Sequence, residues 1–185
     1  QHLEICRDIA LRFNRKFGEI FVVPEPTLKQ MQFMNLDKGL RIRDLVNPEK
    51  KMSKSAKDAK SKILLLDNPE RAAKKIMSAT TDSVGKIQFD MFNQAGISNL
   101  LQMLSLLKNE PLQDVIARWT GETSYGDLKQ EVAAVVQHFL RDFQEKVAGI
   151  SDKTVLAVLE QGEERMRKKA NAKLLEVQRA VGIRR

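Results

Sequence analysis

The stretch Lys51-Met52-Ser53-Lys54-Ser55 lies inside a strongly basic segment of this 185-residue chain. Six lysines fall between residues 50 and 62, with Asp58 as the one acidic residue among them. No apolar period of a helix or a strand is present there, so the segment is predicted to be an exposed loop. Ammonium groups and hydroxyls on a loop can hold a polyphosphate while charge moves onto a leaving pyrophosphate. The alternative is a plain solvated lysine run, which is the commoner meaning of such a segment.

Apolar residues recur at steps of three and four along most of the chain, which predicts helices and a mainly α fold. Gly18 is expected to end the first helix and Gly162 to break the last one. Asp67 or Asn68 is expected to cap the second helix, because Pro69 follows. The predicted helices cover residues 3–17, 69–78, 98–108, 111–119 and 125–147, followed by a last helix or helix pair that begins at Ser151 or Asp152.

Two short segments are predicted to be extended. Residues 19–23, Glu-Ile-Phe-Val-Val, form a β-rich run stopped by Pro24, and we expect the last strand of an open α/β sheet there. Residues 40–45 alternate apolar and polar side chains and should lead into the loop as a short strand or extended segment. Residues 27–40 between them are expected to be irregular or a short helical insertion. The apolar residues 63–66 should anchor the chain back on the core after the loop.

These elements predict two domains. Residues 1–68, which include the basic loop, are interpreted as the end of an α/β nucleotide-binding domain, and residues 69–185 as a helical bundle. The chain has no initiator methionine, and the apolar period already begins at Leu3. We therefore expect a fragment of a longer protein, or a chain whose front part is absent.

The composition narrows the class of protein. Hydrophobic residues make up 42% and charged residues 30% of the chain, as in a soluble globular protein. No apolar run is long enough to span a bilayer, so no membrane partner is expected. The single cysteine, Cys6, excludes an internal disulfide framework and is compatible with a reducing compartment such as the cytoplasm. The net charge of +8 favours an acidic partner, with nucleic acid as the natural candidate and a basic but partnerless protein as the alternative.

Several single residues invite a catalytic or metal-binding interpretation that their surroundings do not favour. His2 at a helix start is expected to cap or pack, and Cys6 to be a small buried apolar residue. Trp119 is expected in the core more than at a base-stacking surface. His138 has no cysteine or histidine at metal-ligand spacing, so no metal site is predicted.

The pentapeptide 51–55 is the second signature of class I aminoacyl-tRNA synthetases. Further stretches in the same order and spacing resemble the C-terminal part of bacterial tryptophanyl-tRNA synthetases, from Gln1 to about Gly182. The opening Gln-His-Leu-Glu is shared with the tyrosyl relatives, whereas the Thr-Asp-Ser and Gly-Ile-Ser-Asn-Leu-Leu stretches favour the tryptophanyl family. The stretches that carry the resemblance are Gln1–Glu4, Ala79–Ser83, Gly96–Leu101 and Tyr125-Gly126.

The resemblance implies a role for each residue of the loop. Lys54 matches the catalytic lysine that stabilises the charge on the departing phosphates, and Lys51 matches a second catalytic, phosphate-binding lysine. Ile42 and Met52 match positions that touch the adenine end through backbone groups, and the two serines would order the closed loop. The implied nucleotide-binding set is Ile42, Lys51, Met52, Ser53, Lys54 and Ser55.

This chain departs from the family pattern directly after the loop. The family often has aspartate after the final serine, whereas Ala56 and Lys57 precede Asp58 here. What caps the loop in this chain is therefore left open by the sequence, while the lysine roles are unaffected.

The resemblance also implies partners. It implies a Rossmann-like catalytic domain followed by an anticodon-binding helical domain, with ATP and Mg²⁺ used to activate tryptophan, tRNA(Trp) as acceptor, and a homodimer. A second basic cluster fits contact with tRNA, and a solvated helix face is its alternative. That cluster comprises Arg165, Arg167, Lys168, Lys169, Lys173, Arg179, Arg184 and Arg185.

The first class I signature, a His-Ile-Gly-His type of turn, is absent from these 185 residues. We therefore expect the chain to be the C-terminal portion of a tryptophan–tRNA ligase that does not activate tryptophan by itself. Two alternatives stay open: a tyrosyl-tRNA synthetase relative, and a non-catalytic tRNA- or protein-binding module that has kept the loop.

Overall fold

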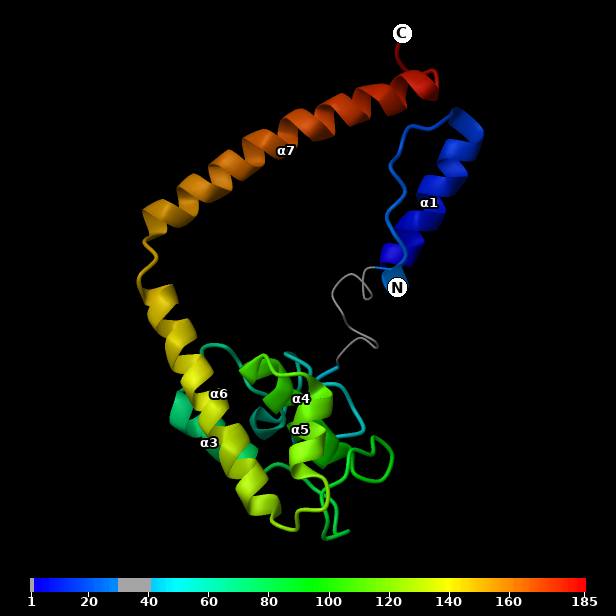
Figure 1. Cartoon of the computed structure of the whole chain (residues 1–185). Coiled ribbons are helices and arrows are strands. Elements are labelled where there is room, and N and C mark those ends of the chain that lie inside the picture. The colour runs from blue at the N-terminus through cyan, green and yellow to red at the C-terminus, as the bar shows by residue number, and fades with distance from the viewer. Residues whose placement is uncertain (1, 30–40) are drawn as a thin grey trace. The chain divides into compact units, whose positions relative to one another are not determined.

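The computed structural model describes residues 2–29 and 41–185 and divides the chain into two compact units (Figure 1). One unit joins residues 1–39 with residues 150–185, and the other comprises residues 40–149. Most of the insertion predicted at residues 27–40 lies outside the described residues, which resume at Arg41.

Helices make up most of the described chain, which confirms the mainly α prediction. Gly18 ends the first helix with a φ of 93°, a conformation that glycine adopts without steric cost. The side chains of Asn68 and Ser151 cap helices as predicted, accepting hydrogen bonds from the amides of Arg71 and Thr154. The helices are α1 His2–Phe17, the 3-10 helix η1 Ala59–Ser61, α3 Pro69–Met77, α4 Ala95–Lys108, α5 Leu112–Trp119, α6 Tyr125–Ala148 and α7 Asp152–Ala180.

The strand predicted at residues 19–23 is wrong. The backbone there is irregular, and its polar groups are bound by the side chain of Asn14 on α1. Asn14 Oδ1 accepts from the amide of Phe21 at 2.9 Å, and Asn14 Nδ2 donates to the Phe21 carbonyl at 2.7 Å. The Phe21 ring packs edge-on against Phe13. A β-rich run becomes a strand only where a partner strand is available, and here a helix side chain takes that place.

The break predicted at Gly162 is also wrong, because α7 continues through this residue to Ala180. A single glycine costs a helix only about 1 kcal/mol relative to alanine, so good helix formers on both sides outweigh it. None of the residues 152–180 of α7 is buried. Several of the apolar residues along α7 are exposed to solvent, including Leu156, Val158, Leu159 and Met166.

The core of the unit 40–149 lies where apolar stripes of four helices meet. Helix α3 packs against α6, and α4 packs against both α5 and α6 (Figure 1). Each helix contributes at least one fully buried side chain to this core, for example Ile76, Leu104, Val115 and Val132. Trp119 packs against the same cluster, in agreement with its predicted core position.

A polar network joins the segment between α3 and α4 to the start of α6. Gln94 is 2% exposed, and its amide donates to Asp82 Oδ1 at 2.9 Å and to the Lys86 carbonyl at 2.8 Å. Tyr125 donates its hydroxyl proton to the same Asp82 oxygen at 2.6 Å. Burial raises the pKa of Asp82, but these donors outweigh it and leave the pKa below its ordinary value. Asp82 and Tyr125, from two of the sequence stretches that carry the family resemblance, therefore touch each other.

Gly96 lets the start of α4 approach the preceding segment. A Cβ atom at this position would lie 2.1 Å from the Thr80 carbonyl oxygen, which is too close for any side chain. The backbone there would have to move, whereas a Cβ at Gly162 would meet nothing within 4 Å.

We predict opposite effects for alanine at these two glycines. Gly96→Ala should lower the free energy of unfolding of the unit 40–149 by about 2–4 kcal/mol, because the helix must shift away from Thr80. Gly162→Ala should leave that unit unchanged and raise the thermal stability of α7, since alanine favours a helix by about 1 kcal/mol over glycine. Urea unfolding followed by the fluorescence of Trp119, together with far-UV circular dichroism, measures both. A wild-type transition for Gly96→Ala would contradict the close approach.

Candidate functional site

The base of the basic loop is a narrow turn formed by residues 42–52. Arg43 and Lys51 form an isolated antiparallel bridge. The Met52 amide donates to the Ile42 carbonyl at 2.9 Å, and the Asp44 amide donates to the Lys50 carbonyl at 2.9 Å. The predicted extended segment is therefore present over its described part. Because the chain doubles back here, Ile42 and Met52 lie side by side at the mouth of the loop.

Asn99 on α4 fixes this base to the core. Its Oδ1 accepts from the Arg43 amide at 2.7 Å, and its Nδ2 donates to the Arg43 carbonyl at 3.2 Å. Asn99 is 2% exposed, so both hydrogen bonds are shielded from water. The neighbouring residue Leu45 donates to the Ser61 carbonyl at 2.9 Å and accepts from the Thr80 amide at 2.8 Å. The segment before the loop is thus hydrogen-bonded to α4, to Thr80 and to Ser61 at the far end of the loop.

The loop itself is stabilised by short-range hydrogen bonds. The Ala56 amide donates to the Ser53 carbonyl at 3.1 Å, which closes a turn over residues 53–56. The hydroxyls of Ser53 and Ser55 lie 3.1 Å apart. Asp58 then caps η1, because its Oδ1 accepts from the Lys60 amide at 2.8 Å. Asp58 therefore caps the short helix that follows the loop. The carbonyls of the turn 53–56 are bonded by a different partner.

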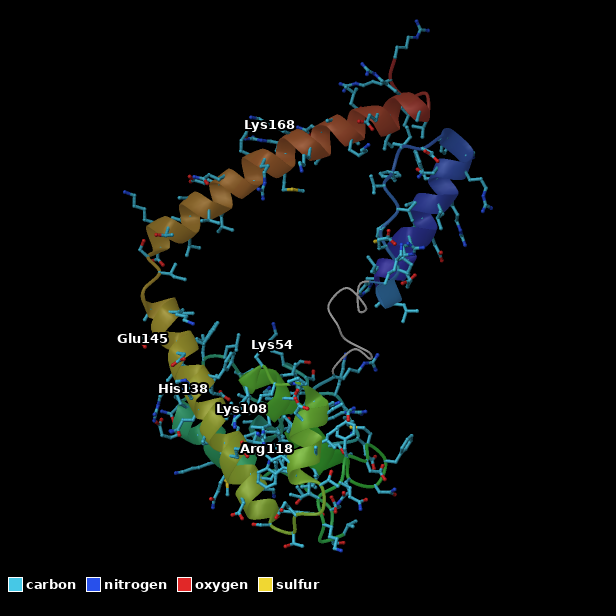
Figure 2. All side chains as sticks on the ribbon, in the orientation of Figure 1. Lys54, Lys108, Arg118, His138, Glu145 and Lys168 are labelled. Carbon is cyan, nitrogen blue, oxygen red and sulfur yellow. The ribbon has the colours of Figure 1, made fainter. Side chains whose placement is uncertain are left out.

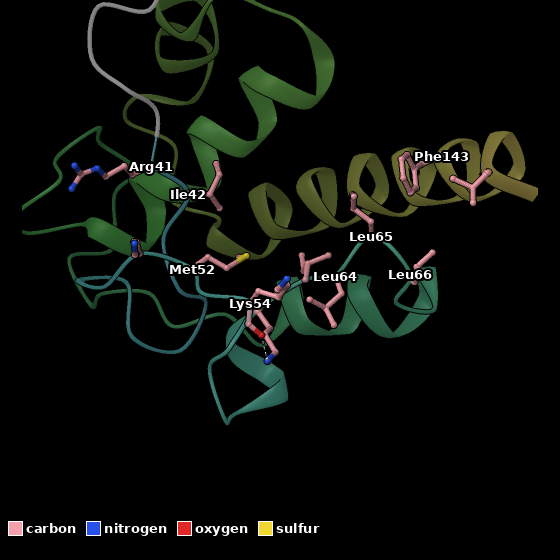
Figure 3. A pocket seen from close by; sticks show the side chains of 12 residues that line it. Arg41, Ile42, Met52, Lys54, Leu64, Leu65, Leu66 and Phe143 are labelled. Atoms are coloured by element: carbon pink, nitrogen blue, oxygen red, sulfur yellow. Dashed lines mark hydrogen bonds between the residues drawn. The ribbon is translucent and has the colours of Figure 1, made fainter. Parts of the chain in front are cut away.

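Lys62 is that partner. Its Nζ donates to the carbonyl of Lys54 at 2.7 Å, marked by a dashed line in Figure 3, and also to the carbonyl of Ala56. The backbone of Lys62 is bound in turn by α3, because Lys75 Nζ donates to the Lys62 carbonyl at 2.9 Å. Lys75 also forms an ion pair with Asp67 at 2.6 Å.

Asp67 is a well-satisfied carboxylate. It accepts from Lys75 Nζ and from the Leu64 amide, the latter at 3.0 Å. Burial raises the pKa of Asp67, but these donors outweigh it, so the pKa lies below its ordinary value. The carbonyl of Asp67 accepts from Gln144 on α6 at 2.8 Å, which ties this segment to a second helix.

A hollow of about 840 Å³ opens beside the loop (Figure 3). Four cationic side chains are among the described residues that line it, and no carboxylate is among them. The apolar wall that makes up much of the lining includes three consecutive leucines and side chains of α6. The cationic residues are Arg41, Lys51, Lys54 and Lys62, and the apolar ones include Leu64, Leu65, Leu66, Phe143 and Val147.

The structure brings four of the six predicted site residues to this hollow. Ile42, Lys51, Met52 and Lys54 line it, whereas Ser53 and Ser55 face each other and are not among its lining residues. Lys51 and Lys54 are exposed, and no hydrogen bond or ion pair to another described residue involves either ammonium group. Two lysines on one turn therefore present unpaired charge at the hollow (Figure 2 labels Lys54).

Sequence reasoning missed Lys62 and the apolar wall. Lys62 stood in the counted run of lysines, but nothing in the run separates it from Lys57 or Lys60. Phe143 lies within the helix predicted at residues 125–147, and nothing in that pattern indicates that it lines a hollow. The anchoring role predicted for residues 63–66 holds only for Ile63, which packs against the core, because residues 64–66 are exposed.

Other single residues behave less as predicted. Cys6 is exposed, not buried, because it lies on a side of α1 that the described residues do not cover. His138 is exposed on α6, and its Nε2 lies 3.4 Å from Asp142 Oδ2 (Figure 2).

In the described residues no group of three or more histidine, cysteine, aspartate or glutamate side chains is placed to hold a metal ion. Across the same residues, no helix combines the length and the apolar character needed to cross a membrane.

The second basic cluster lies mostly on α7, where Figure 2 labels Lys168. Part of its charge is balanced along the helix, since Glu164 pairs with Arg167 and Lys168, the latter at 3.4 Å. Lys173 pairs with Glu176 and donates to the Ile20 carbonyl at 2.8 Å, so it helps to fasten the segment after α1.

Comparison with known proteins identifies relatives over the whole chain. A family model described as tRNA synthetases class I (W and Y) matches residues 1–141. The tryptophan–tRNA ligase of Caldanaerobacter subterraneus subsp. tengcongensis is 44% identical over 183 residues, which cover 99% of this chain and 54% of that protein. The Bacillus subtilis tryptophan–tRNA ligase is 39% identical over 186 residues and covers the whole chain. The chain spans about half the length of these curated relatives.

A solved structure agrees with these relatives. The crystal structure of tryptophanyl-tRNA synthetase from Mycoplasma pneumoniae matches with a TM-score of 0.79 and 32% sequence identity. The match covers 98% of this chain and 53% of that one. Fold and sequence therefore point to the same group of proteins.

We predict that Asn99→Ala weakens the base of the loop. The substitution leaves the amide and the carbonyl of Arg43 without their partner, which should lower the free energy of unfolding by about 1–3 kcal/mol. Asn47→Ala is the matched control, because Asn47 is exposed and its side chain bonds no described residue. Urea unfolding of both variants measures the difference. Equal stabilities would show that the Asn99 amide does not anchor this segment.

We also predict an acid-sensitive contribution from Asp67. Because its folded pKa is lowered, the carboxylate stabilises the fold above the unfolded pKa of about 3.9, and this stabilisation is lost as the pH falls through the lower folded value. The stability advantage of the wild type over Asp67→Asn should thus shrink steadily below about pH 4. Urea unfolding between pH 3 and pH 7 tests this. A difference between the two proteins that does not change with pH would contradict this contribution of Asp67.

Proposed function

Because this chain belongs to the class I tRNA synthetases of the tryptophan and tyrosine type, we propose that it supplies the phosphate loop and the helical region of a tryptophan–tRNA ligase. The whole enzyme would use ATP to activate tryptophan as tryptophanyl-adenylate and then transfer tryptophan to tRNA(Trp). The family membership supports the reaction class, and the named relatives support tryptophan as the amino acid.

One observation carries this proposal: the ammonium groups of Lys51 and Lys54, which have no partner among the described residues, stand beside the paired segments of Ile42 and Met52 at a single hollow. A triphosphate is a flexible polyanion, and cations fixed at one edge of a cavity bind it through charge-assisted hydrogen bonds. The backbone at Ile42 and Met52 would contact the adenine end. We propose Lys51 and Lys54 as catalytic residues, with Ser53 and Ser55 helping to order the closed loop.

The proposed reaction requires positive charge close to the departing phosphates. A carboxylate oxygen of tryptophan attacks the α-phosphorus of ATP, and the bond from that phosphorus to the α–β bridging oxygen breaks. Pyrophosphate leaves with the electron pair, so negative charge grows on the bridging oxygen and the β- and γ-phosphates. Ammonium groups at that position stabilise the transition state more than the ground state, which is the requirement for catalysis. Lys54 is the residue proposed for this role.

Mg²⁺ is implied by the family, but the residues of the hollow do not fit a magnesium site. Mg²⁺ prefers carboxylate and water oxygens, whereas the described charged lining is cationic. Any magnesium ion would therefore be brought by the phosphates of ATP, and no step is assigned to it here.

The remaining parts of the proposal concern domains and partners. We propose residues 1–68 as the end of a Rossmann-like catalytic domain and residues 69–185 as the anticodon-binding region, in a cytoplasmic homodimeric enzyme. Some basic residues of α7, such as Arg165, Lys169 and Arg179, pair with no residue in the described part of the chain, which supports contact with tRNA phosphates. Their binding would weaken as the salt concentration rises.

A tyrosyl-specific relative is the second candidate, because the matching family includes both specificities. The amino-acid pocket decides between them, and its residues are not assigned in this chain. Pyrophosphate exchange by the full-length protein with tryptophan and with tyrosine separates the two candidates. A protein active with neither amino acid would instead support a non-catalytic tRNA- or protein-binding module.

We predict that Lys54→Ala in the full-length protein slows adenylate formation by an amount equivalent to about 2–4 kcal/mol, because a transition-state contact is lost. The measurement is pyrophosphate exchange at saturating ATP and tryptophan. Lys60→Ala is the matched control, since Lys60 belongs to the same basic segment but is absent from the hollow's described lining. An unchanged rate for Lys54→Ala would refute the catalytic role of this lysine.

A further inference from the structure

We propose that Lys62 is a positioning residue of the phosphate loop: its ammonium group fixes the backbone of Lys54, so that the Lys54 side chain reaches the nucleotide from a defined point. This inference rests on the proposed function and adds a residue that neither the signature nor its spacing indicates. Lys62 acts through Lys54 and is not proposed to touch the phosphates.

The first step of the argument is what Lys62 binds. Its Nζ donates to two carbonyls of the turn 53–56, those of Lys54 at 2.7 Å and of Ala56. No other hydrogen bond among the described residues reaches either carbonyl. The side chain of Ala56 has no polar atom that could close the turn locally. A cation donating to the carbonyls of residues 54 and 56 therefore replaces a local cap with a contact across the loop.

The second step is that Lys62 is itself held in place. Lys75 Nζ donates to the Lys62 carbonyl at 2.9 Å and pairs with Asp67 at 2.6 Å. The side chains of Lys75 and Asp67 are only 17% and 20% exposed, so water competes weakly for this pair. Gln144 of α6 donates to the carbonyls of Leu65 and Asp67, at 2.9 and 2.8 Å. A continuous set of hydrogen bonds thus runs from α3 and α6 to the loop.

The third step is what this achieves for the reaction. A lysine side chain has four rotatable bonds, and fixing it against a phosphate costs conformational entropy. If the loop backbone also had to be ordered at that moment, the cost would rise by about 1–2 kcal/mol for each residue. With the Lys54 carbonyl already bound, only the side chain remains to be placed. Prior ordering of this kind lowers the barrier to a reaction that depends on the position of a charge.

Geometry also separates Lys62 from the phosphate-binding lysines. Lys51 and Lys54 have unbonded ammonium groups, whereas the Lys62 ammonium is engaged by two carbonyl oxygens. Two of the three donors of the Lys62 ammonium are used by these carbonyls, so at most one is left for a phosphate oxygen. Its place in the lining of the hollow is thus explained by its contact with the loop.

The first experiment measures the loop without reference to activity. We expect Lys62→Met to speed tryptic cleavage after Lys54 and Lys57 by about tenfold, since cleavage follows the population of the open loop and tenfold corresponds to about 1.4 kcal/mol. Mass spectrometry of the fragments gives the rates. Lys60→Met is the matched control, because Lys60 is exposed in the same segment and its side chain bonds no described residue. Lys62→Arg, which keeps the donor groups, should restore most of the protection.

The second experiment measures pyrophosphate exchange in the full-length protein. We expect Lys62→Met to lower kcat by about tenfold while the KM for ATP stays within about twofold, because a positioning residue affects the transition state more than ground-state binding. Lys60→Met should leave both values unchanged, and Lys62→Arg should recover most of kcat. A raised KM for ATP with unchanged cleavage would make Lys62 a phosphate ligand and overturn the proposal, as would wild-type values of both cleavage and kcat.

The two experiments keep this inference apart from the proposed function. If the unsubstituted full-length protein exchanges pyrophosphate with neither tryptophan nor tyrosine, the proposed function fails, and faster cleavage in Lys62→Met still shows that Lys62 holds the loop. If exchange is normal and cleavage is unaffected by Lys62→Met, the proposed function stands and the role of Lys62 is refuted. Thermal unfolding of each variant confirms that the compared proteins are folded.

Discussion

The buried amide of Asn99 is the interaction on which the placement of the basic loop depends. It satisfies both backbone polar groups of Arg43 in a site closed to water. The Asn99 side chain forms the hydrogen bonds that a neighbouring strand would otherwise form, since it offers one donor and one acceptor to an extended segment. Because α4 is packed on α5 and α6, the position of Arg43, and with it the neighbouring Ile42 and Met52, is set by the core.

The helices could be predicted from the sequence, because an apolar stripe and a capping residue are both local signals. Asn68 and Ser151 cap as their positions indicated, and the bounds differ from the predicted ones by at most a few residues. The irregular segments could not be predicted in the same way. Whether residues 19–23 form a strand depends on a partner strand, and the side chain of Asn14 supplied a competing set of hydrogen bonds that no periodicity reveals.

The site could be predicted from the sequence only in part. The motif at residues 51–55 located the loop and singled out Lys51 and Lys54 within it, although most lysine runs are solvated surface. It could not separate Lys62 from Lys57 and Lys60, which have the same side chain in the same segment. Only the folded chain does so, because η1 and the turn 53–56 bring the Lys62 ammonium back to the Lys54 carbonyl. The sequence shows that residue 62 is a lysine, but it does not show the hydrogen bond from this lysine to the Lys54 carbonyl.

The composition of the hollow explains why such a contact is needed. Four cations line one cavity against an apolar wall, and like charges near a low-dielectric surface repel each other more strongly than in bulk water. Left unrestrained, the lysines of the loop would lower this repulsion by moving apart into solvent. Binding one of the four, Lys62, to backbone carbonyls keeps its charge near the loop and ties the turn that carries Lys54. In the proposed reaction, the repulsion that remains between Lys51 and Lys54 would be relieved by a bound polyanion, and most fully when negative charge builds up on departing phosphates.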